Sequence, residues 1–183
     1  MNSLKFEASA ADSWFVRMAT VEVAREDVVR RQIESVGRDA NVDDALYAPD
    51  AVRYDPVTAQ GMKGRDAIRK WHEMIVKAFT DADSRVVSII SKGDFAAAEW
   101  AATGIHSGAF EMPMGTVGPT NRRVTLRGAT FYRFNREGLI VEQYDYWDNA
   151  NFAQQLGVKP LETMSRTRSV SFQWQGASVK FQA

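Results

Sequence analysis

Residues 122–148 read RRVTLRGATFYRFNREGLIVEQYDYWD, and this stretch decides the fold. Apolar and polar residues alternate over 122–135 and again over 139–148, which is the pattern of strands with one buried face. The turn residues Arg136-Glu137-Gly138 separate the two segments, so we expect an antiparallel hairpin. In the first strand the even-numbered residues from Val124 to Phe134 are the more apolar, and this face is predicted to point into the core.

Two more strands are expected upstream, over 84–92 and 95–107, with the turn Lys92-Gly93-Asp94 between them. Before them the apolar residues follow helical spacing, over 22–37 and again over 65–79. Helices followed by a strand meander predict an α+β domain, in which the helices cover one face of a curved antiparallel sheet. A sheet bent around helices leaves a conical cavity.

Smaller elements complete the pattern. Residues 51–56 are expected to form a short strand that is closed by its proline, followed by a glycine-containing loop at 60–64. A short helix is expected to start after Asn41. Asp148 or Asn149 is positioned as the N-cap of a last helix over 150–156, with Asp148 favoured.

The composition excludes several classes of protein. The chain has 183 residues, 45% of them apolar, and 23 basic residues balance 23 acidic ones, so we expect a single domain that binds neither nucleic acid nor an anionic membrane surface. There is no cysteine and there are only two histidines, so we predict no metal and no cofactor, and the composition fits a cytoplasmic protein. No stretch is long and apolar enough for a membrane span.

Three regions are expected along the chain: an N-terminal extension over 1–24 that is partly helical, the main domain over 25–158, and a C-terminal tail over 159–183. Within the tail, residues 168–175 alternate apolar with polar side chains. The tail is therefore predicted to hold an extra edge strand or to pair with a neighbouring subunit.

Six short segments follow one another along the chain: LYAPDAV at 46–52, GRDAI at 64–68, GIHSG at 104–108, NRRV at 121–124, GLIVE at 138–142 and YDYWD at 144–148. Together they resemble the SnoaL-like polyketide cyclase family of the nuclear-transport-factor-2-like superfamily. The resemblance implies a cone-shaped α+β barrel, with N-terminal helices packed in a strongly curved antiparallel sheet, and a homodimer formed through exposed sheet faces. The superfamily includes aldol cyclases, epoxide-opening enzymes, isomerases, dehydratases and domains without catalysis, so the fold leaves the reaction open.

His106 is the first candidate catalytic residue. Strand alternation places it on the same face as Ala102 and Gly104, whose small size favours a cavity wall. The family pattern has a pocket histidine at this position, and an imidazole can give or take a proton near neutral pH. The alternative is a histidine held by a backbone carbonyl at a strand end. The other histidine, His72, is expected to face solvent from its helix.

Asp145 is the second candidate. The alternation alone does not decide which face of its strand points inward. Resemblance to the limonene-epoxide-hydrolase branch, where the first aspartate of a similar Asp-Tyr-aromatic-Asp segment faces the pocket, favours Asp145. A buried carboxylate there can orient an imidazole or act as an acid itself.

The sequence departs from the family at the positions that define its known mechanisms. Thr130 occupies the place of the acid/base aspartate of aldol cyclases, so it can only donate or accept a hydrogen bond to a substrate oxygen. Trp100 and Ala102 replace the arginine and aspartate that the epoxide hydrolases carry on this strand. The remaining candidate substrate contacts are aromatic, and for each of them core packing is the alternative: Tyr54, Trp71, Trp100, Tyr132 and Trp147.

These observations predict a cofactor-independent cyclase or isomerase that moves a proton on a small hydrophobic, polyketide-like or polycyclic substrate. A non-catalytic ligand-binding or assembly domain of the same fold is the first alternative. An epoxide-opening cyclase or hydrolase with Asp145 as the acid is the second.

Overall fold

A computed structural model describes residues 10–41, 43–112 and 115–158. Residues 10–24 of the predicted N-terminal extension belong to a helix that continues to Ser35, and the division of the chain at residue 24 stays a prediction. The predicted extra strand in the tail over 159–183 lies outside the described residues.

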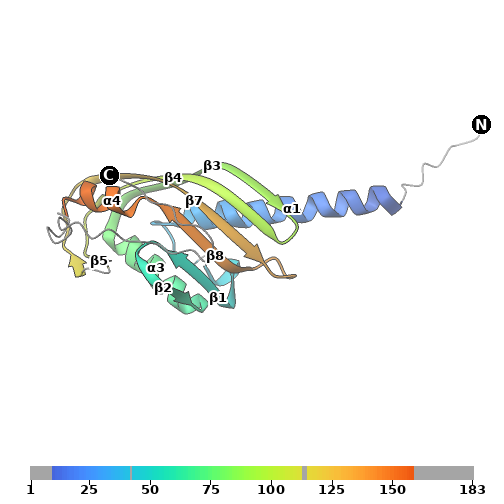
Figure 1. The fold of residues 1–183 in the computed structure, drawn as a ribbon, viewed down its shortest axis with the longest axis horizontal. Helices are drawn as coiled ribbons and strands as arrows, with labels where there is room; N and C mark the ends of the chain where they lie inside the picture. The colour runs from blue at the N-terminus through green and yellow to red at the C-terminus, as the bar shows by residue number, and fades with distance from the viewer. Residues whose placement is uncertain (1–9, 42, 113–114, 159–183) are drawn as a thin grey trace, which may run out of the picture.

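The chain forms an α+β fold in which helices fill the concave side of a curved six-stranded sheet (Figure 1). The sheet order is β2-β1-β8-β7-β4-β3, and a separate two-stranded sheet pairs β5 with β6. In chain order the elements are α1 (Ala10–Ser35), α2 (Asp43–Leu46), β1 (Tyr47–Asp55), β2 (Thr58–Lys63), α3 (Arg65–Ala78), β3 (Phe79–Lys92), β4 (Phe95–His106), β5 (Phe110–Met112), β6 (Gly115–Val117), β7 (Arg123–Phe134), β8 (Ile140–Trp147) and α4 (Asn149–Leu156).

The predicted hairpin is confirmed: β7 and β8 pair antiparallel, with Thr130 opposite Asp145. The even-numbered face of β7 points inward, because Val124, Tyr132 and Phe134 are buried while the arginines between them are exposed. Inward alternation of this kind fixes the register, since a slip by one residue would turn the whole apolar set to solvent.

Two details differ from the sequence expectation. The sheet is not antiparallel throughout, because β1 runs parallel to β8. Residues 60–64, expected to be a loop, belong largely to β2, which pairs antiparallel with β1 after the turn at Pro56. The segment TAQGMK lacks apolar alternation, so its strand conformation comes from the hydrogen bonds that it makes at the sheet edge.

The curvature of the sheet has a local cause. The pairing of β3 with β4 shifts register between Thr80 and Asp83 and again between Val86 and Ser88. Bulges bend a strand and increase its twist. In Figure 1 β3, β4 and β7 arch over the helices as a result.

A hydrophobic core joins α1 and α3 to the concave face of the sheet. Val29 and Ile33 of α1 and Ile68 of α3 are buried together with Tyr132 and Ile140. No helix among the described residues is both long enough and apolar enough to cross a membrane.

Gly128 gives the sheet room for an indole. A Cβ atom built at this position would lie 2.4 Å from a carbon of the Trp100 ring. Only glycine therefore lets the Trp100 side chain lie across β7 on the concave face.

The N-cap predicted at Asp148 is confirmed, because its carboxylate accepts a hydrogen bond from the Asn151 amide at 2.9 Å as α4 begins. We expect Asp148→Ala to lower the free energy of unfolding by about 1 kcal/mol, the usual contribution of such a cap. Urea unfolding measures this loss, and Asp148→Asn, which keeps the acceptor oxygen, serves as the control. Equal losses in both variants would contradict the capping role.

Candidate functional site

A cavity of about 120 Å³ lies between the concave face of the sheet and the helices. The inward positions of β4 and β7 supply one wall, through Trp100, Ala102, Gly104 and Thr130. Aromatic rings make up much of the remaining surface: Trp71, Phe79, Phe110, Trp147 and Phe152. An apolar cavity with a few polar groups is the usual form of a small-molecule site.

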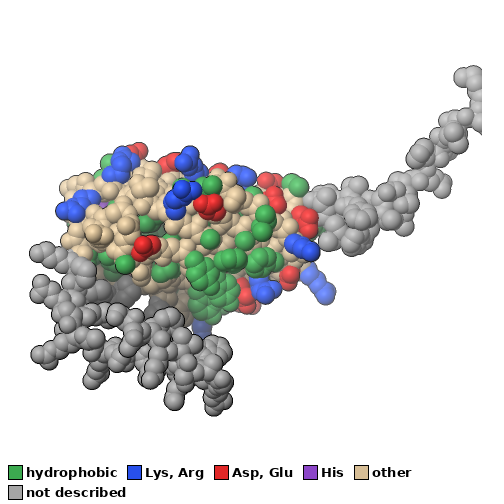
Figure 2. Space-filling view, turned by 45° about the horizontal axis from the view of Figure 1, so that its top comes forward, with side chains coloured by type: hydrophobic (Ala, Val, Ile, Leu, Met, Phe, Trp, Pro, Cys, Tyr) green, Lys and Arg blue, Asp and Glu red, His purple; other side chains and the backbone are tan. Residues whose placement is uncertain are grey.

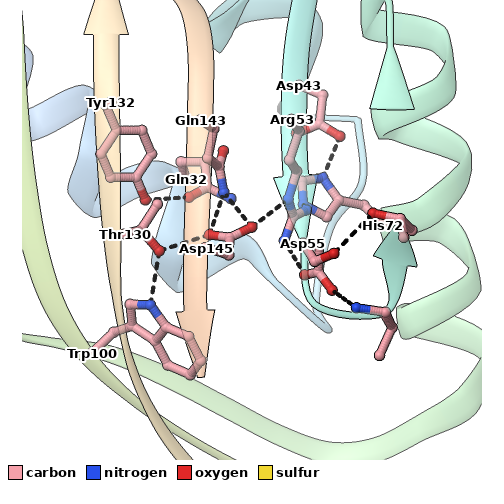
Figure 3. A network of polar contacts seen from close by, with 12 residues as sticks. Gln32, Asp43, Arg53, Asp55, His72, Trp100, Thr130, Tyr132, Gln143 and Asp145 are labelled. Carbon is pink, nitrogen blue, oxygen red and sulfur yellow. Dashed lines mark hydrogen bonds and ion pairs between the residues drawn. The ribbon is translucent and has the colours of Figure 1, made fainter. Parts of the chain in front are cut away.

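Asp145 is the polar centre of this cavity (Figure 3). Its Oδ1 accepts hydrogen bonds from the Thr130 hydroxyl at 2.7 Å and from the Gln143 amide at 2.9 Å. Tyr47 donates its hydroxyl to the other end of the Gln143 amide, which turns the amide nitrogen toward Asp145. The carboxylate is thus held in one orientation by neighbours on β7, β8 and β1.

Arg53 of β1 supplies the positive charge of the site. Its Nε donates to Asp145 Oδ2 at 2.7 Å, and one of its terminal nitrogens lies 3.4 Å from Asp55 Oδ2. The guanidinium carbon lies 3.7 Å from the centre of the Trp71 ring, in a cation–π contact. The Arg53 side chain is only 5% exposed, so these contacts replace water as its solvation.

Asp55 is a carboxyl group of different character. It follows Arg53 by two residues on β1 and is buried with it in the cavity wall. Burial raises the pKa of Asp55, and the negative charge of Asp145 adds to this effect while Arg53 opposes it. The site therefore combines a carboxylate held by several donors with a second carboxyl group, Asp55, whose pKa lies above the ordinary value of an aspartate.

His72 corrects the sequence expectation, because it does not face solvent. It is 2% exposed and lies on the inner side of α3. Its Nδ1 is 2.5 Å from Asp43 Oδ2 and its Nε2 is 2.7 Å from a terminal nitrogen of Arg53. Burial lowers the pKa of His72. His72 lies at the border of the apolar face of α3, and this position in the helical pattern did not predict that its side chain is buried.

The structure brings several predicted site residues to the cavity and leaves others outside its lining. Asp145 lines the cavity together with Trp71, Trp100, Thr130 and Trp147. The Trp100 indole N–H donates to the Thr130 hydroxyl at 2.9 Å, which joins it to the Asp145 network.

Tyr54, Tyr132 and His106 are not among the lining residues. Tyr54 is 40% exposed and stacks on Tyr144 on the convex side of the sheet. Tyr132 is buried, and its hydroxyl donates to Gln32 of α1 at 2.8 Å.

His106 is buried at the end of β4, behind the aromatic lining of the cavity. Its ring lies 5.2 Å from that of Phe79, which does line the cavity. Its Nδ1 is 3.1 Å from the Thr120 hydroxyl, and its Nε2 has no polar partner among the residues that the structure describes. The alternative interpretation placed a backbone carbonyl beside this histidine, and the structure has instead Thr120, on the connection that leads to β7.

Sequence reasoning missed Arg53, Asp55 and Gln143. The alternation of β1 offered one signal, since Arg53 and Asp55 share a face with Ala51, which is fully buried. An arginine between a buried alanine and an aspartate is unusual on an inward face, because a buried charge requires a partner. The partner, Asp145, is 92 positions away and only the parallel pairing of β1 with β8 brings it near.

The chain is similar to known proteins in sequence and in fold. The model of the SnoaL-like domain family matches residues 29–143, which is well over half of the chain. No curated protein matches the chain.

Among solved structures, IdmH from Streptomyces antibioticus, described as a candidate polyketide cyclase, is 30% identical with a TM-score of 0.57, covering 73% of this chain and 99% of IdmH. AclR from Streptomyces galilaeus, described as a candidate hydroxylase, is 28% identical with a TM-score of 0.59, covering 78% of this chain and 84% of AclR. A candidate SnoaL-like polyketide cyclase from Jannaschia sp. CCS1 has a TM-score of 0.66 at 15% identity, covering 85% of this chain and all of that one. Because the family model matches residues 29–143, the chain belongs to the SnoaL-like domain family.

Proposed function

We propose that this protein catalyses proton transfer on a small hydrophobic, polyketide-like or polycyclic ketone, which leads to cyclisation or isomerisation. The observation that carries the proposal is the pair of buried carboxyl groups, Asp145 and Asp55, on either side of the Arg53 guanidinium in an aromatic cavity. Two titratable groups of contrasting environment are the usual arrangement for a general base and a general acid. The similarity to IdmH, described as a candidate polyketide cyclase, supports the substrate class.

In this proposal Asp145 removes a proton from the carbon next to the substrate carbonyl. In an isomerisation the electron pair moves to the carbonyl oxygen. When a ring closes, the pair forms a carbon–carbon bond to a second carbonyl of the same molecule, and the π electrons of that carbonyl move to its oxygen. Asp55, whose pKa is raised by burial, protonates the resulting oxygen. In the isomerisation Asp145 then returns its proton to a different carbon, while Asp55 recovers its own proton from the enol oxygen as the carbonyl re-forms. After a ring closure Asp145 passes its proton to Asp55 through solvent, so in both cases the enzyme ends unchanged.

Arg53 has two tasks in this scheme. Its positive charge lies between the two carboxyl groups and stabilises whichever of them is ionised. Its contact with the Trp71 ring fixes the plane of the guanidinium. Trp71, Trp100 and Trp147 then provide the apolar surface on which a flat substrate packs.

His106 was predicted from the sequence as the proton shuttle, and we retain it as a second candidate acid. Asp55 is favoured here because it lines the cavity beside Arg53, whereas the His106 ring lies behind Phe79. A movement of Phe79 would be needed to bring a substrate oxygen within hydrogen-bond distance of His106. Tyr54 and Tyr132, which are predicted as substrate contacts, do not line the cavity either.

Arg53 also favours a second candidate function, the opening of an epoxide by water or by an internal hydroxyl group. The arginine absent from β4, where Trp100 stands, is supplied by β1 instead, again between two carboxyl groups. In this reaction Asp145 takes the proton of the attacking oxygen and Asp55 gives one to the epoxide oxygen as its carbon–oxygen bond breaks.

Proton exchange provides a test that does not require the natural substrate. We would incubate the protein with 2-tetralone in deuterium oxide and follow the loss of the α-proton signals by NMR, and with cyclohexene oxide to follow diol formation. Enzyme-dependent deuterium incorporation supports the ketone proposal, and diol formation supports the second candidate. Binding of the probes without either reaction would refute catalysis and favour the ligand-binding domain.

We also propose that the protein forms a homodimer through the convex face of the sheet. Tyr146 is 58% exposed there and Phe131 is 38% exposed, and their rings lie 5.7 Å apart. Tyr54 and Tyr144 stack beside them at 4.9 Å. Figure 2 shows hydrophobic side chains gathered into a continuous area of surface among the charged ones. Such an area on one face is a common mark of an interface.

We expect the double change Phe131→Glu and Tyr146→Glu to convert the dimer to a monomer of about 20.5 kDa, because four carboxylates would face one another across a two-fold axis. Sedimentation equilibrium measures the mass, and Glu73→Lys on the exposed side of α3 is the control. A wild-type mass of 20.5 kDa at micromolar concentration would refute the homodimer.

A cytoplasmic location stays a prediction from the cysteine-free composition.

A further inference from the structure

We propose that His72, oriented by Asp43, is a positioning residue that holds the Arg53 guanidinium against Asp145; the inference rests on the proposed function of that site. The contact chain runs from Asp43 on α2 through His72 on α3 to Arg53 on β1 and Asp145 on β8. It joins four elements that are separated in the sequence, and Figure 3 shows its members lying side by side.

The donors and acceptors of this chain can be assigned without ambiguity. A guanidinium only donates hydrogen bonds, so the His72 Nε2 atom, 2.7 Å from Arg53, must accept and carries no proton. The proton of a neutral ring then resides on Nδ1 and is donated to the Asp43 carboxylate at 2.5 Å. Asp43 therefore selects the tautomer of His72 that can bind Arg53.

A doubly protonated His72 does not fit this arrangement, because it would direct an N–H at the guanidinium. The charged groups around the ring are Asp43 from α2, Arg53 from β1 and Asp145 from β8. Tyr47 of β1 and Trp71 of α3 face it with their rings, 6.4 and 5.1 Å away. Burial outweighs the two carboxylates and lowers the pKa of His72, which keeps the ring neutral.

Arg53 needs a partner on the helix side. Asp145 and Asp55 both bind the guanidinium from the sheet side, and the weaker of the two contacts, to Asp55, is 3.4 Å long. The hydrogen bond that a terminal nitrogen of Arg53 donates to His72 fixes the third edge of the guanidinium. With three edges held, the guanidinium has a single orientation, and so has the Asp145 carboxylate that it binds. His72 does not line the cavity, so it acts through Arg53.

The test is an NMR experiment on the full-length protein. Because the chain has only two histidines, long-range proton–nitrogen correlation spectra can resolve both rings. The His72→Gln variant, which lacks one set of ring signals, assigns them. We expect the His72 ring at pH 7.5 to be protonated on Nδ1 and bare on Nε2. A ring protonated on Nε2 would overturn the proposal, and the tautomer itself is read from the wild-type protein.

The Arg53 Nε–H signal provides the second readout. We expect His72→Phe, which has no acceptor, to speed hydrogen exchange at Arg53 Nε by about tenfold or more, because a guanidinium that loses the bond from its terminal nitrogen to His72 is held less firmly with its Nε against Asp145. In His72→Gln the side-chain oxygen can accept from Arg53, so the signal should stay close to wild type. Unchanged exchange in both variants would refute the positioning role.

The 2-tetralone assay separates this inference from the proposed function. If wild type exchanges the α-proton, we expect His72→Phe to lose most of this activity and His72→Gln to retain it. A wild type that lacks activity but shows the predicted tautomer and the predicted Arg53 response would refute the proposed function alone. An active His72→Phe variant with unchanged Arg53 exchange would refute the positioning role alone.

Discussion

Asp145→Asn is expected to lower the rate of α-proton exchange into 2-tetralone by about 10²- to 10⁴-fold, the range that general acid–base groups contribute. Asparagine has the size of aspartate, and its single side-chain oxygen can still accept from Arg53 in the place of Oδ2, so the cavity keeps its volume. It cannot take a proton from carbon. The same substitution should leave binding of 2-tetralone, measured by tryptophan fluorescence, within about threefold of wild type, because an apolar ring system binds mainly through buried area.

The matched control is Asp50→Asn, an exposed aspartate on the same strand as Arg53. It makes the same chemical change outside the cavity and should leave the exchange rate unaffected. A wild-type exchange rate in Asp145→Asn would remove Asp145 from the mechanism. His106→Gln measured alongside decides between the two candidate acids, since loss of activity there with retention in Asp55→Asn would restore the histidine as the proton donor.

Arg53→Met is expected to lower the free energy of unfolding at pH 7.5 by about 3–5 kcal/mol, the cost of removing one partner from a buried ion pair. Methionine fills most of the volume and keeps the contact with the Trp71 ring. It leaves Asp145 and Asp55, whose side chains are 4% and 1% exposed, without a compensating charge. Urea unfolding measures the loss.

The pH dependence of this loss has a definite sign. Arg53 lowers the pKa of Asp55, whereas burial raises it. Removing Arg53 takes away the largest influence that lowers this pKa, leaving the hydrogen bonds of Val57 and Trp147 against burial and the charge of Asp145, so the folded state of the variant binds a proton on Asp55 more tightly than the unfolded state does. A group of this kind contributes stability below its unfolded pKa, near 3.8, and this stability is lost as the pH rises through its folded pKa. The deficit of Arg53→Met should therefore be largest at pH 7.5 and should shrink toward pH 5.

A second substitution tests the cause. Adding Asp145→Asn to Arg53→Met should restore part of the lost stability, because it removes one of the two unpaired charges. Arg85→Met, on the exposed side of β3, is the control and should change stability by less than about 0.5 kcal/mol. A deficit that is independent of pH and is not relieved in the double variant would show that Arg53 stabilises the fold by packing and not by charge.

Much of the fold was predictable because its signals are local. The alternation in β7 and β8, the helical spacing in α3 and the cap at Asp148 each involve neighbours in the sequence. The inward face of β7 could be assigned because one parity is apolar and the other carries arginines. Strand β2 lacked such a pattern, and its conformation depends on an edge partner that local sequence does not reveal.

The polar site was much less predictable, and His72 shows why. Its place on α3 between Trp71 and Glu73 suited an exposed side chain, yet the ring is buried against Asp43 and Arg53. A polar residue at the border of an apolar helix face is buried only if another element brings a partner to it. Here that element is β1, whose position depends on its pairing with β8.

The sequence by itself determined the α+β class, the curved sheet around helices, the aromatic wall that includes Trp100, and the family resemblance. Short-range periodicity and residue size carry these features, and each is enforced by burial of apolar surface close to where it is encoded. Only the tertiary structure decided that Asp145 is bound to Arg53, that Asp55 and His72 flank this pair, and that His106 lies behind the cavity wall. Electrostatic partners are chosen by distance in space, and the parallel pairing of β1 with β8 brings together charges 92 positions apart in the chain.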